Sequence, residues 1–188
     1  MRRLFALLFA LVFTVPVAAQ PAPPAPAVEY DKPGPEHALL ASIAGRWTSV
    51  YHVTSRPGAK PVDVPGTAEF RTTLSGLWID GDTRLQMGES RIDGRVVYGF
   101  DRFKGQYVFL FLQERDTQPL FGYGTADSTG RRITFTVPMD LPVVNLRAVP
   151  VRTVLDLSVP DRLTFEMNTP IGGGKDYQPL RIDYVRAK

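Results

Sequence analysis

The stretch Ser42–Val53, "SIAGRWTSVYHV", marks the point at which the spacing of apolar residues changes. Before Gly45, Leu40 and Ile43 are spaced as they would be on one face of a helix. From Trp47 onward the pattern has a period of two, which is typical of a strand with one buried face. The stretch therefore predicts a short helix followed directly by the first strand of a sheet.

The helix belongs to the longer segment "PGPEHALLASIAG". Pro35 suits the first helical position, and Glu36 suits the positive end of the helix dipole. Gly45 is expected to end the helix as its C-terminal cap. The segment predicts a helix of two or three turns.

The remainder of the chain is predicted to form strands separated by turn signals such as "LSG", "FKGQ" and "DSTG". The expected strands are Arg46–Thr54, Gly66–Leu74, Leu77–Gln86, Arg95–Arg102, Gln106–Arg115, Pro119–Asp127, Arg132–Met139, Arg152–Val159, Arg162–Thr169 and Gln178–Val185. Such a series indicates an antiparallel meander, and closure into a barrel would remove its exposed edges. We therefore expect an all-β protein, an up-and-down antiparallel barrel of about 8–10 strands with a short N-terminal helix.

Two strands show which face is apolar. The expected inward-facing residues are Ile133, Phe135 and Val137 on one strand, and Leu163, Phe165 and Met167 on another. The segment "YVFLFLQ", 107–113, is apolar on both faces, so that strand is expected to be covered on both sides.

Trp47 follows Gly45 by two residues, which suggests how one end of the barrel is closed. Glycine allows a sharp turn from helix to strand, and the helix would plug the barrel beneath it. The indole of Trp47 would form the floor, covered by a cation from the final strand, either Arg186 or Arg181. We assign structural roles to Gly45, Trp47 and Arg186.

The N-terminal residues are expected to direct export. Residues 1–19 combine a cationic start, an apolar run and small residues before a cleavage point after Ala19, as in a secretory signal peptide. Residues 20–34 form a Pro/Ala-rich linker, and residues 35–188 form the barrel domain. The expected location is the bacterial periplasm or the medium, with no membrane span after cleavage.

Composition excludes several classes of chemistry. The chain has no cysteine, so it forms no disulfide and carries no lipid on a cysteine. Its formal charge is +3, and two of its basic residues, Arg2 and Arg3, belong to the expected signal peptide. The remaining basic and acidic residues are interleaved, so no nucleic-acid partner is expected.

No motif for catalysis or metal binding is visible. His37 and His52 are the two histidines, and a zinc site needs three or four ligands at recognisable spacing. No serine lies in a nucleophile elbow. We therefore assign no catalytic residue and no metal site.

The segment "WIDGDTR" places Asp80, Asp82 and Arg84 on one face of a strand. These residues could line the polar end of a ligand, or they could form a solvated outer face. If they faced a cavity, together with Glu114 or Glu166, they could serve an enzyme as acid and base.

Aromatic residues on the strands favour a small-molecule site, because such sites are concave and mostly apolar. With the residues of "WIDGDTR", the candidate ligand-binding residues are Trp78, Tyr98, Phe109, Phe111, Tyr123 and Phe165. The leading interpretation is a barrel that binds a small apolar or amphipathic molecule. The alternatives are an enzyme that uses acidic residues in the cavity, and a filled structural or protein-interaction module whose rim includes a lid formed by residues 139–151.

Four segments in order, "PGPEHALLASIAGRW", "GLWIDGD", "VYGFDRFKGQYV" and "LRIDYVRAK", together resemble the bacterial family called domain of unknown function 1579. Gly45, Trp47 and a terminal-strand arginine also resemble the calycin pattern of lipocalins and fatty-acid-binding proteins. The resemblance covers Gly34–Lys188 and implies a lipocalin-like barrel without a settled function. In calycins this tryptophan closes the barrel and does not touch ligand.

Some relatives of the calycin fold bind heme through a histidine on a late strand. This chain has no histidine after His52, which leaves Met167 and Tyr184 as candidate axial ligands. No cofactor is expected.

Overall fold

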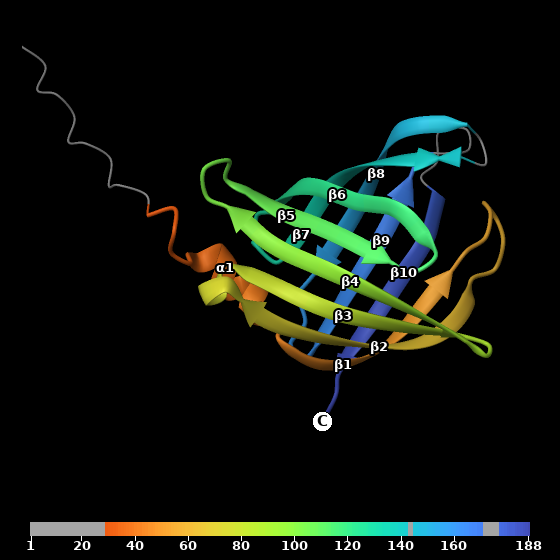
Figure 1. Ribbon diagram of the computed structural model, residues 1–188, viewed down its shortest axis with the longest axis horizontal. Coiled ribbons are helices and arrows are strands. Elements are labelled where there is room, and N and C mark those ends of the chain that lie inside the picture. The colour runs from red at the N-terminus through yellow and green to blue at the C-terminus, as the bar shows by residue number, and fades with distance from the viewer. Residues whose placement is uncertain (1–28, 143–144, 171–176) are drawn as a thin grey trace, which may run out of the picture.

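Ten antiparallel strands form a closed barrel in the computed structural model, which describes residues 29–142, 145–170 and 177–188 (Figure 1). The strands are β1 Gly45–Val53, β2 Val62–Thr73, β3 Trp78–Met87, β4 Ser90–Asp101, β5 Gln106–Gln113, β6 Asp116–Ala126, β7 Arg132–Leu141, β8 Leu146–Asp156, β9 Arg162–Thr169 and β10 Tyr177–Arg186. The predicted all-β up-and-down barrel is confirmed.

Each strand pairs with its neighbours in the sequence, and the pairing of β1 with β10 closes the barrel. In this seam Trp47 lies opposite Arg186, and Tyr51 lies opposite Ile182. Every strand is thus hydrogen-bonded on both sides. Closure removes the unpaired edges that an open sheet of this size would expose.

The helix α1, Pro35–Ala41, packs against β3 and β4 at one end of the barrel (Figure 1). Leu40 and Ile43 are buried in the core, as their spacing predicts. The expected role of Gly45 as helix cap is wrong, because α1 ends earlier and Gly45 opens β1 with a φ of 126°. A 3₁₀ turn, η1 Leu74–Gly76, connects β2 to β3.

The alternation of the strands separates an apolar interior from a polar exterior. Ile133, Phe135 and Val137 of β7 have at most 1 % of their surface exposed, and Leu163 and Phe165 of β9 are also buried. These residues face inward, as the sequence predicts.

The outer side of β5 differs from expectation. Tyr107 and Phe109 are buried inside, and Val108 is buried outside, but Leu112 on the outer side is 45 % exposed. The described part of the chain contains no second sheet or long helix that could cover this face. The prediction that β5 is covered along both faces is therefore wrong toward its C-terminal end.

The segment 139–151, expected as a lid, is mostly the end of a β-hairpin. Met139 pairs with Val149, and Leu141 pairs with Leu146, with an irregularity between these pairs. The Asp140 side chain accepts a hydrogen bond from the backbone N–H of Ala148 at 2.8 Å. Extending the ladder satisfies backbone groups that a loop would leave to solvent. Residues 143 and 144 lie outside the described residues.

The expected signal peptide and residues 20–28 of the expected linker lie outside the described residues. The remainder of that linker contacts the barrel, because Arg102 donates a hydrogen bond to the carbonyl of Lys32 at 3.1 Å. None of the helices in the described part of the chain has the length and apolar character needed to cross a membrane.

Candidate functional site

A cavity of about 350 Å³ occupies the barrel interior on the side away from α1. Its rim includes Met87, Gln113 and Asp116, at the ends of β3, β5 and β6 that point away from α1. Deeper lining residues are Tyr51, Thr83, Leu85, Val96, Tyr98, Phe109, Phe111, Leu120, Phe165, Met167, Leu180, Ile182 and Tyr184. The size and apolar lining match those of small-molecule sites.

The other end of the barrel is filled. Leu40 and Ile43, from α1 and the turn after it, pack there with Trp47, and all three are at most 3 % exposed. The Trp47 indole N–H donates to the carbonyl of Ile43 at 2.8 Å, so the buried ring has its hydrogen-bond partner. The cavity therefore has a solid floor beneath it.

The cavity also contains a small polar group of residues, which we call the tyrosine cluster: Tyr51, Tyr98, Tyr184 and Thr83. These four come from β1, β4, β10 and β3, and each is at most 8 % exposed. Burial raises the pKa of Tyr51, although interaction with the Tyr184 and Thr83 hydroxyls partly offsets the effect. Burial also raises the pKa of Tyr98 and Tyr184, with a smaller contribution from the neighbouring phenols. The phenols are therefore neutral donors at physiological pH.

Glycines make room for the aromatic lining. A methyl group on Gly66 of β2 would lie 2.6 Å from the Tyr51 ring and 2.5 Å from the Arg84 carbonyl oxygen. At Gly81 of β3 it would lie 2.5 Å from the Phe70 ring. Both contacts are too short for any side chain larger than hydrogen.

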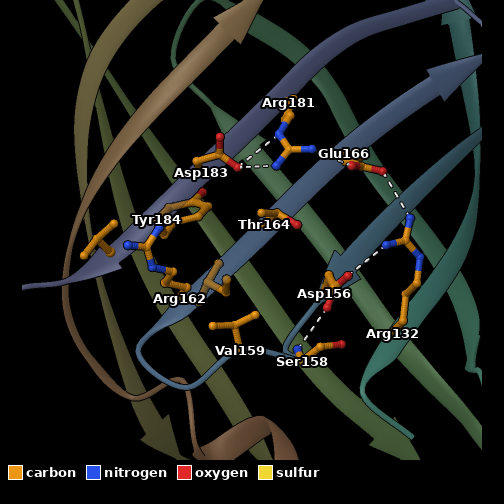
Figure 2. Close-up of a pocket in the computed structure, with 12 residues that line it drawn as sticks. Arg132, Asp156, Ser158, Val159, Arg162, Thr164, Glu166, Arg181, Asp183 and Tyr184 are labelled. Atoms are coloured by element: carbon orange, nitrogen blue, oxygen red, sulfur yellow. Dashed lines mark hydrogen bonds and ion pairs between the residues drawn. The ribbon is translucent and has the colours of Figure 1, made fainter. Parts of the chain in front are cut away.

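A second hollow, of about 360 Å³, lies on the outer surface of the strands β7 to β10 (Figure 2). Glu166 accepts from Arg132 at 3.3 Å and from Arg181 at 3.1 Å. Arg132 also pairs with Asp156 at 2.8 Å, and Arg181 with Asp183 at 2.9 Å. Figure 2 shows Arg132 of β7 bridging to Asp156 of β8 and Glu166 of β9, whereas the Arg181–Asp183 pair lies within β10. Because each of these carboxylates is paired with an arginine, the arrangement fits an ion-pair network that ties strands together.

A third hollow, of about 410 Å³, lies outside the barrel near α1 and is bordered by Tyr30, Trp78, Phe103, Phe121 and Tyr123. Phe103 is 83 % exposed. This hollow lies on the outer surface, whereas the cavity lies inside the barrel wall.

The chain matches the family described as "Protein of unknown function (DUF1579)" over residues 32–186. The chain belongs to this family. The DUF1579 match thus begins just before α1 and includes all ten strands.

Among solved structures, the protein is similar to Rv2717c from M. tuberculosis, for which a crystal structure exists. The two are 12 % identical, with a TM-score of 0.59 over 82 % of this chain and 99 % of that chain. At this identity the likeness shows the fold alone. A search of curated proteins gives no match.

Of the candidate ligand-binding residues in this DUF1579 chain, Tyr98, Phe109, Phe111 and Phe165 line the cavity. Two aromatics lie elsewhere, because their strand positions face outward. Trp78 packs over Gly99, where an added methyl would lie 2.4 Å from its ring, and Tyr123 accepts a hydrogen bond from Lys104 at 2.6 Å.

Asp80, Asp82 and Arg84 lie on the outer face of β3 and do not line the cavity. Asp80 accepts a hydrogen bond from Arg95 at 2.8 Å, Asp82 pairs with Arg71, and Arg84 pairs with Asp93 at 3.7 Å. The alternating inward positions of β3 are occupied by Ile79, Gly81 and Thr83. The sequence-based interpretation of this face as a ligand contact is not retained.

Glu114 and Glu166, named for the enzymatic alternative, also lie outside the cavity. Glu114 accepts from the backbone N–H of Asp93 at 3.1 Å, and Glu166 belongs to the outer ion-pair network. Asp116 is the only carboxylate among the described lining residues, and it lies at the rim.

The sequence did not point to Tyr51 or Thr83 as site residues, and it offered Tyr184 only as a candidate heme ligand. The alternation of the strands could have placed two of them in the interior. Tyr51 lies on the same strand face as Trp47, and Tyr184 lies on the same strand face as Arg186. Residues of one strand that lie an even number of positions from a floor residue point into the same interior.

Neither histidine reaches the cavity. His37 is buried in α1, where its Nδ1 accepts from the Gly34 N–H at 3.0 Å, and His52 lies outside between Asp63 and Asp183. In the described part of the chain, no three His, Asp or Glu side chains are grouped to hold a metal ion. Met167 and Tyr184, the remaining candidates for an axial heme ligand, both line the cavity.

Proposed function

We propose that the protein binds one small apolar or amphipathic molecule inside its barrel. The observation that carries the proposal is the apolar cavity of about 350 Å³, enclosed by the strands and closed at the α1 end. A volume of this size holds a molecule of drug-like dimensions. The carboxylates required for the enzymatic alternative lie outside the cavity or at its rim, so binding is the better-supported function.

The first test is native mass spectrometry of the mature chain, beginning at Gln20 and purified from its export host. A bound molecule should appear as a mass shift that denaturation removes, and extraction then gives its chemical class. A second readout is titration with the neutral dye Nile red, whose fluorescence rises in apolar surroundings.

A variant that fills the cavity locates the binding site. Met139 lines the cavity, and Met139→Trp replaces its side chain with a larger, aromatic one. The variant should weaken Nile red binding at least tenfold. Leu112→Trp adds a ring to the outer side of β5, where Leu112 is 45 % exposed, and should leave binding unchanged. An apo mass together with no dye binding would count against the proposal, as would loss of binding in Leu112→Trp alone.

We also propose that the protein is exported, with residues 1–19 removed after Ala19. The cationic start, apolar run and small residues of that segment support this. Fractionation of the producing cell followed by N-terminal sequencing is the test. An N-terminus at Gln20 in the periplasmic fraction or medium is expected, and full-length protein retained in the cytoplasm would contradict the proposal.

A further inference from the structure

The tyrosine cluster is the main polar feature of an otherwise apolar cavity. Tyr51, Tyr98 and Tyr184 come from three different strands and line the same cavity. A barrel serving only as a packed core would gain more from phenylalanine at these positions, because a buried hydroxyl must find a partner.

Tyr98 is the most informative member. The residue is 4 % exposed, and its hydroxyl has no hydrogen bond to any residue that the structure describes. Its ring is fixed between Phe109, at a centroid distance of 5.7 Å, and Phe135, at 6.2 Å. Tyr98 therefore lines the cavity with a rigidly held ring, and its hydroxyl is a donor that lacks a protein acceptor.

The charge of the lining is equally informative. Among the described residues that line the cavity there is no lysine, arginine or histidine. Burying a carboxylate or phosphate requires a cation or a dense set of donors, because the charge loses its hydration. The described lining supplies neutral donors at the tyrosine cluster and a carboxylate, Asp116, at the rim.

We propose that the bound molecule is uncharged at its buried end and presents a hydrogen-bond acceptor of the carbonyl type to Tyr98, with its apolar body against Phe109 and Phe111. This inference rests on the proposed binding function and narrows it to a ligand class. The inference excludes a free fatty acid bound with its carboxylate inside the cavity.

The test uses three ligands of nearly equal shape in competition with Nile red. They are 2-acetylnaphthalene, with a neutral carbonyl acceptor, 2-ethylnaphthalene, without an acceptor, and 2-naphthoate, with a carboxylate. The acetyl compound should bind about fivefold more tightly than the ethyl compound, which is the usual effect of one neutral hydrogen bond. Naphthoate should bind at least tenfold more weakly than the acetyl compound.

Matched tyrosine variants connect the preference to the cluster. Tyr98→Phe should reduce the affinity for 2-acetylnaphthalene about fivefold and change that for 2-ethylnaphthalene by less than twofold. Tyr123→Phe, which removes a phenol from the outer face, should change neither affinity. If the Tyr98→Phe variant still binds 2-ethylnaphthalene, its cavity is intact.

Each outcome separates this inference from the function on which it rests. Equal or tighter binding of the ethyl compound or of naphthoate overturns the neutral-acceptor inference and leaves the binding function in place. An acetyl preference that survives Tyr98→Phe also overturns it. If Nile red and all three compounds fail to bind, the proposed function fails with it. If Tyr98→Phe does not fold, the order of the three affinities in the unmodified protein decides.

Discussion

The guanidinium of Arg186 lies over the indole of Trp47, with 4.3 Å between Cζ and the ring centroid. The same guanidinium donates to the carbonyl oxygens of Ala44 at 2.7 Å and Ser42 at 2.8 Å. Its Nε donates to Asp161 at 2.7 Å. One side chain of β10 therefore fixes both the floor ring and the turn that follows α1.

Arg186→Ala should lower the free energy of unfolding by about 2 kcal/mol, because it removes a cation–π contact and charge-assisted hydrogen bonds to two carbonyls. Urea denaturation followed by tryptophan fluorescence measures the change. Arg84→Ala, on the outer face, should cost less than about 0.5 kcal/mol. Equal effects of the two variants would contradict the structural role of Arg186.

Gly45→Ala should be more damaging than Gly58→Ala, although both glycines have a positive φ. Gly45 has a φ of 126°, and an added methyl would lie 2.7 Å from Arg186 Nη1. Backbone strain together with displacement of the arginine should cost about 3 kcal/mol. At Gly58 the φ is 79° and no atom lies within 4 Å of an added methyl, so alanine there should cost about 1 kcal/mol. Thermal melts of both variants provide the comparison.

His52 should make stability depend on pH near neutrality. Hydrogen bonds to Asp63, foremost, and to Asp183 raise its pKa above the usual 6.5, despite opposition from burial. A raised folded-state pKa means that the stabilisation is complete below about pH 6.5 and is lost as pH rises through the folded-state value. Because the site is partly exposed, the contribution should stay below about 1 kcal/mol. The advantage over His52→Gln should shrink between pH 6 and pH 8, and a constant difference would refute the prediction.

His37 should act in the opposite direction. Burial is the main cause that lowers its pKa from 6.5. A lowered pKa means that stability is complete above about pH 6.5 and falls as the pH drops below that value, where the unfolded chain takes up the proton. His37→Asn keeps a side-chain acceptor for the Gly34 N–H and should reduce the loss of stability between pH 7 and pH 5. Unfolding measured at both pH values, beside His52→Gln, separates the two histidines.

Glu166→Gln should weaken the outer ion-pair network. Glu166 has a side chain only 16 % exposed and bridges Arg132 and Arg181, so its neutralisation should cost about 1 kcal/mol. Glu69 also lies between two arginines, Arg46 and Arg71, but is 42 % exposed. Glu69→Gln should cost less than half as much. In 1 M salt the Glu69→Gln effect should shrink more than the Glu166→Gln effect, because screening weakens exposed charge pairs more than partly buried ones.

The sequence predicted the strands well because alternation is strong where one face is apolar. It predicted poorly which face of β3 points inward. The inward positions Gly81 and Thr83 are small or polar, so hydrophobicity alone does not distinguish them from Asp80 and Asp82. Gly81 is inward because the Phe70 ring fills the space a side chain would need. That relationship depends on a neighbouring strand and its register.

The assignment of the structural role to Arg186 rather than Arg181 agrees with the structure. Ile182 and Tyr184 of β10 are buried, and Arg186 continues their face. Arg181 lies on the opposite face and pairs with Glu166. By contrast, Glu166 pairs with arginines of two other strands, Arg132 and Arg181. Only the folded barrel brings these strands close to one another. No local pattern contains that information.

The β1–β10 seam has a kinetic consequence. Trp47 pairs with Arg186 across 139 positions of the chain, so the floor and the wall can be completed only after β10 has been synthesised. Contacts so distant in sequence carry a large entropic cost before they give any stabilisation, and barrels of this kind fold slowly. A chain truncated before Tyr177 would contain nine strands, and the edges of β1 and β9 that normally pair with β10 would lack hydrogen-bond partners. Such a chain would expose unpaired strand edges until its tenth strand is added.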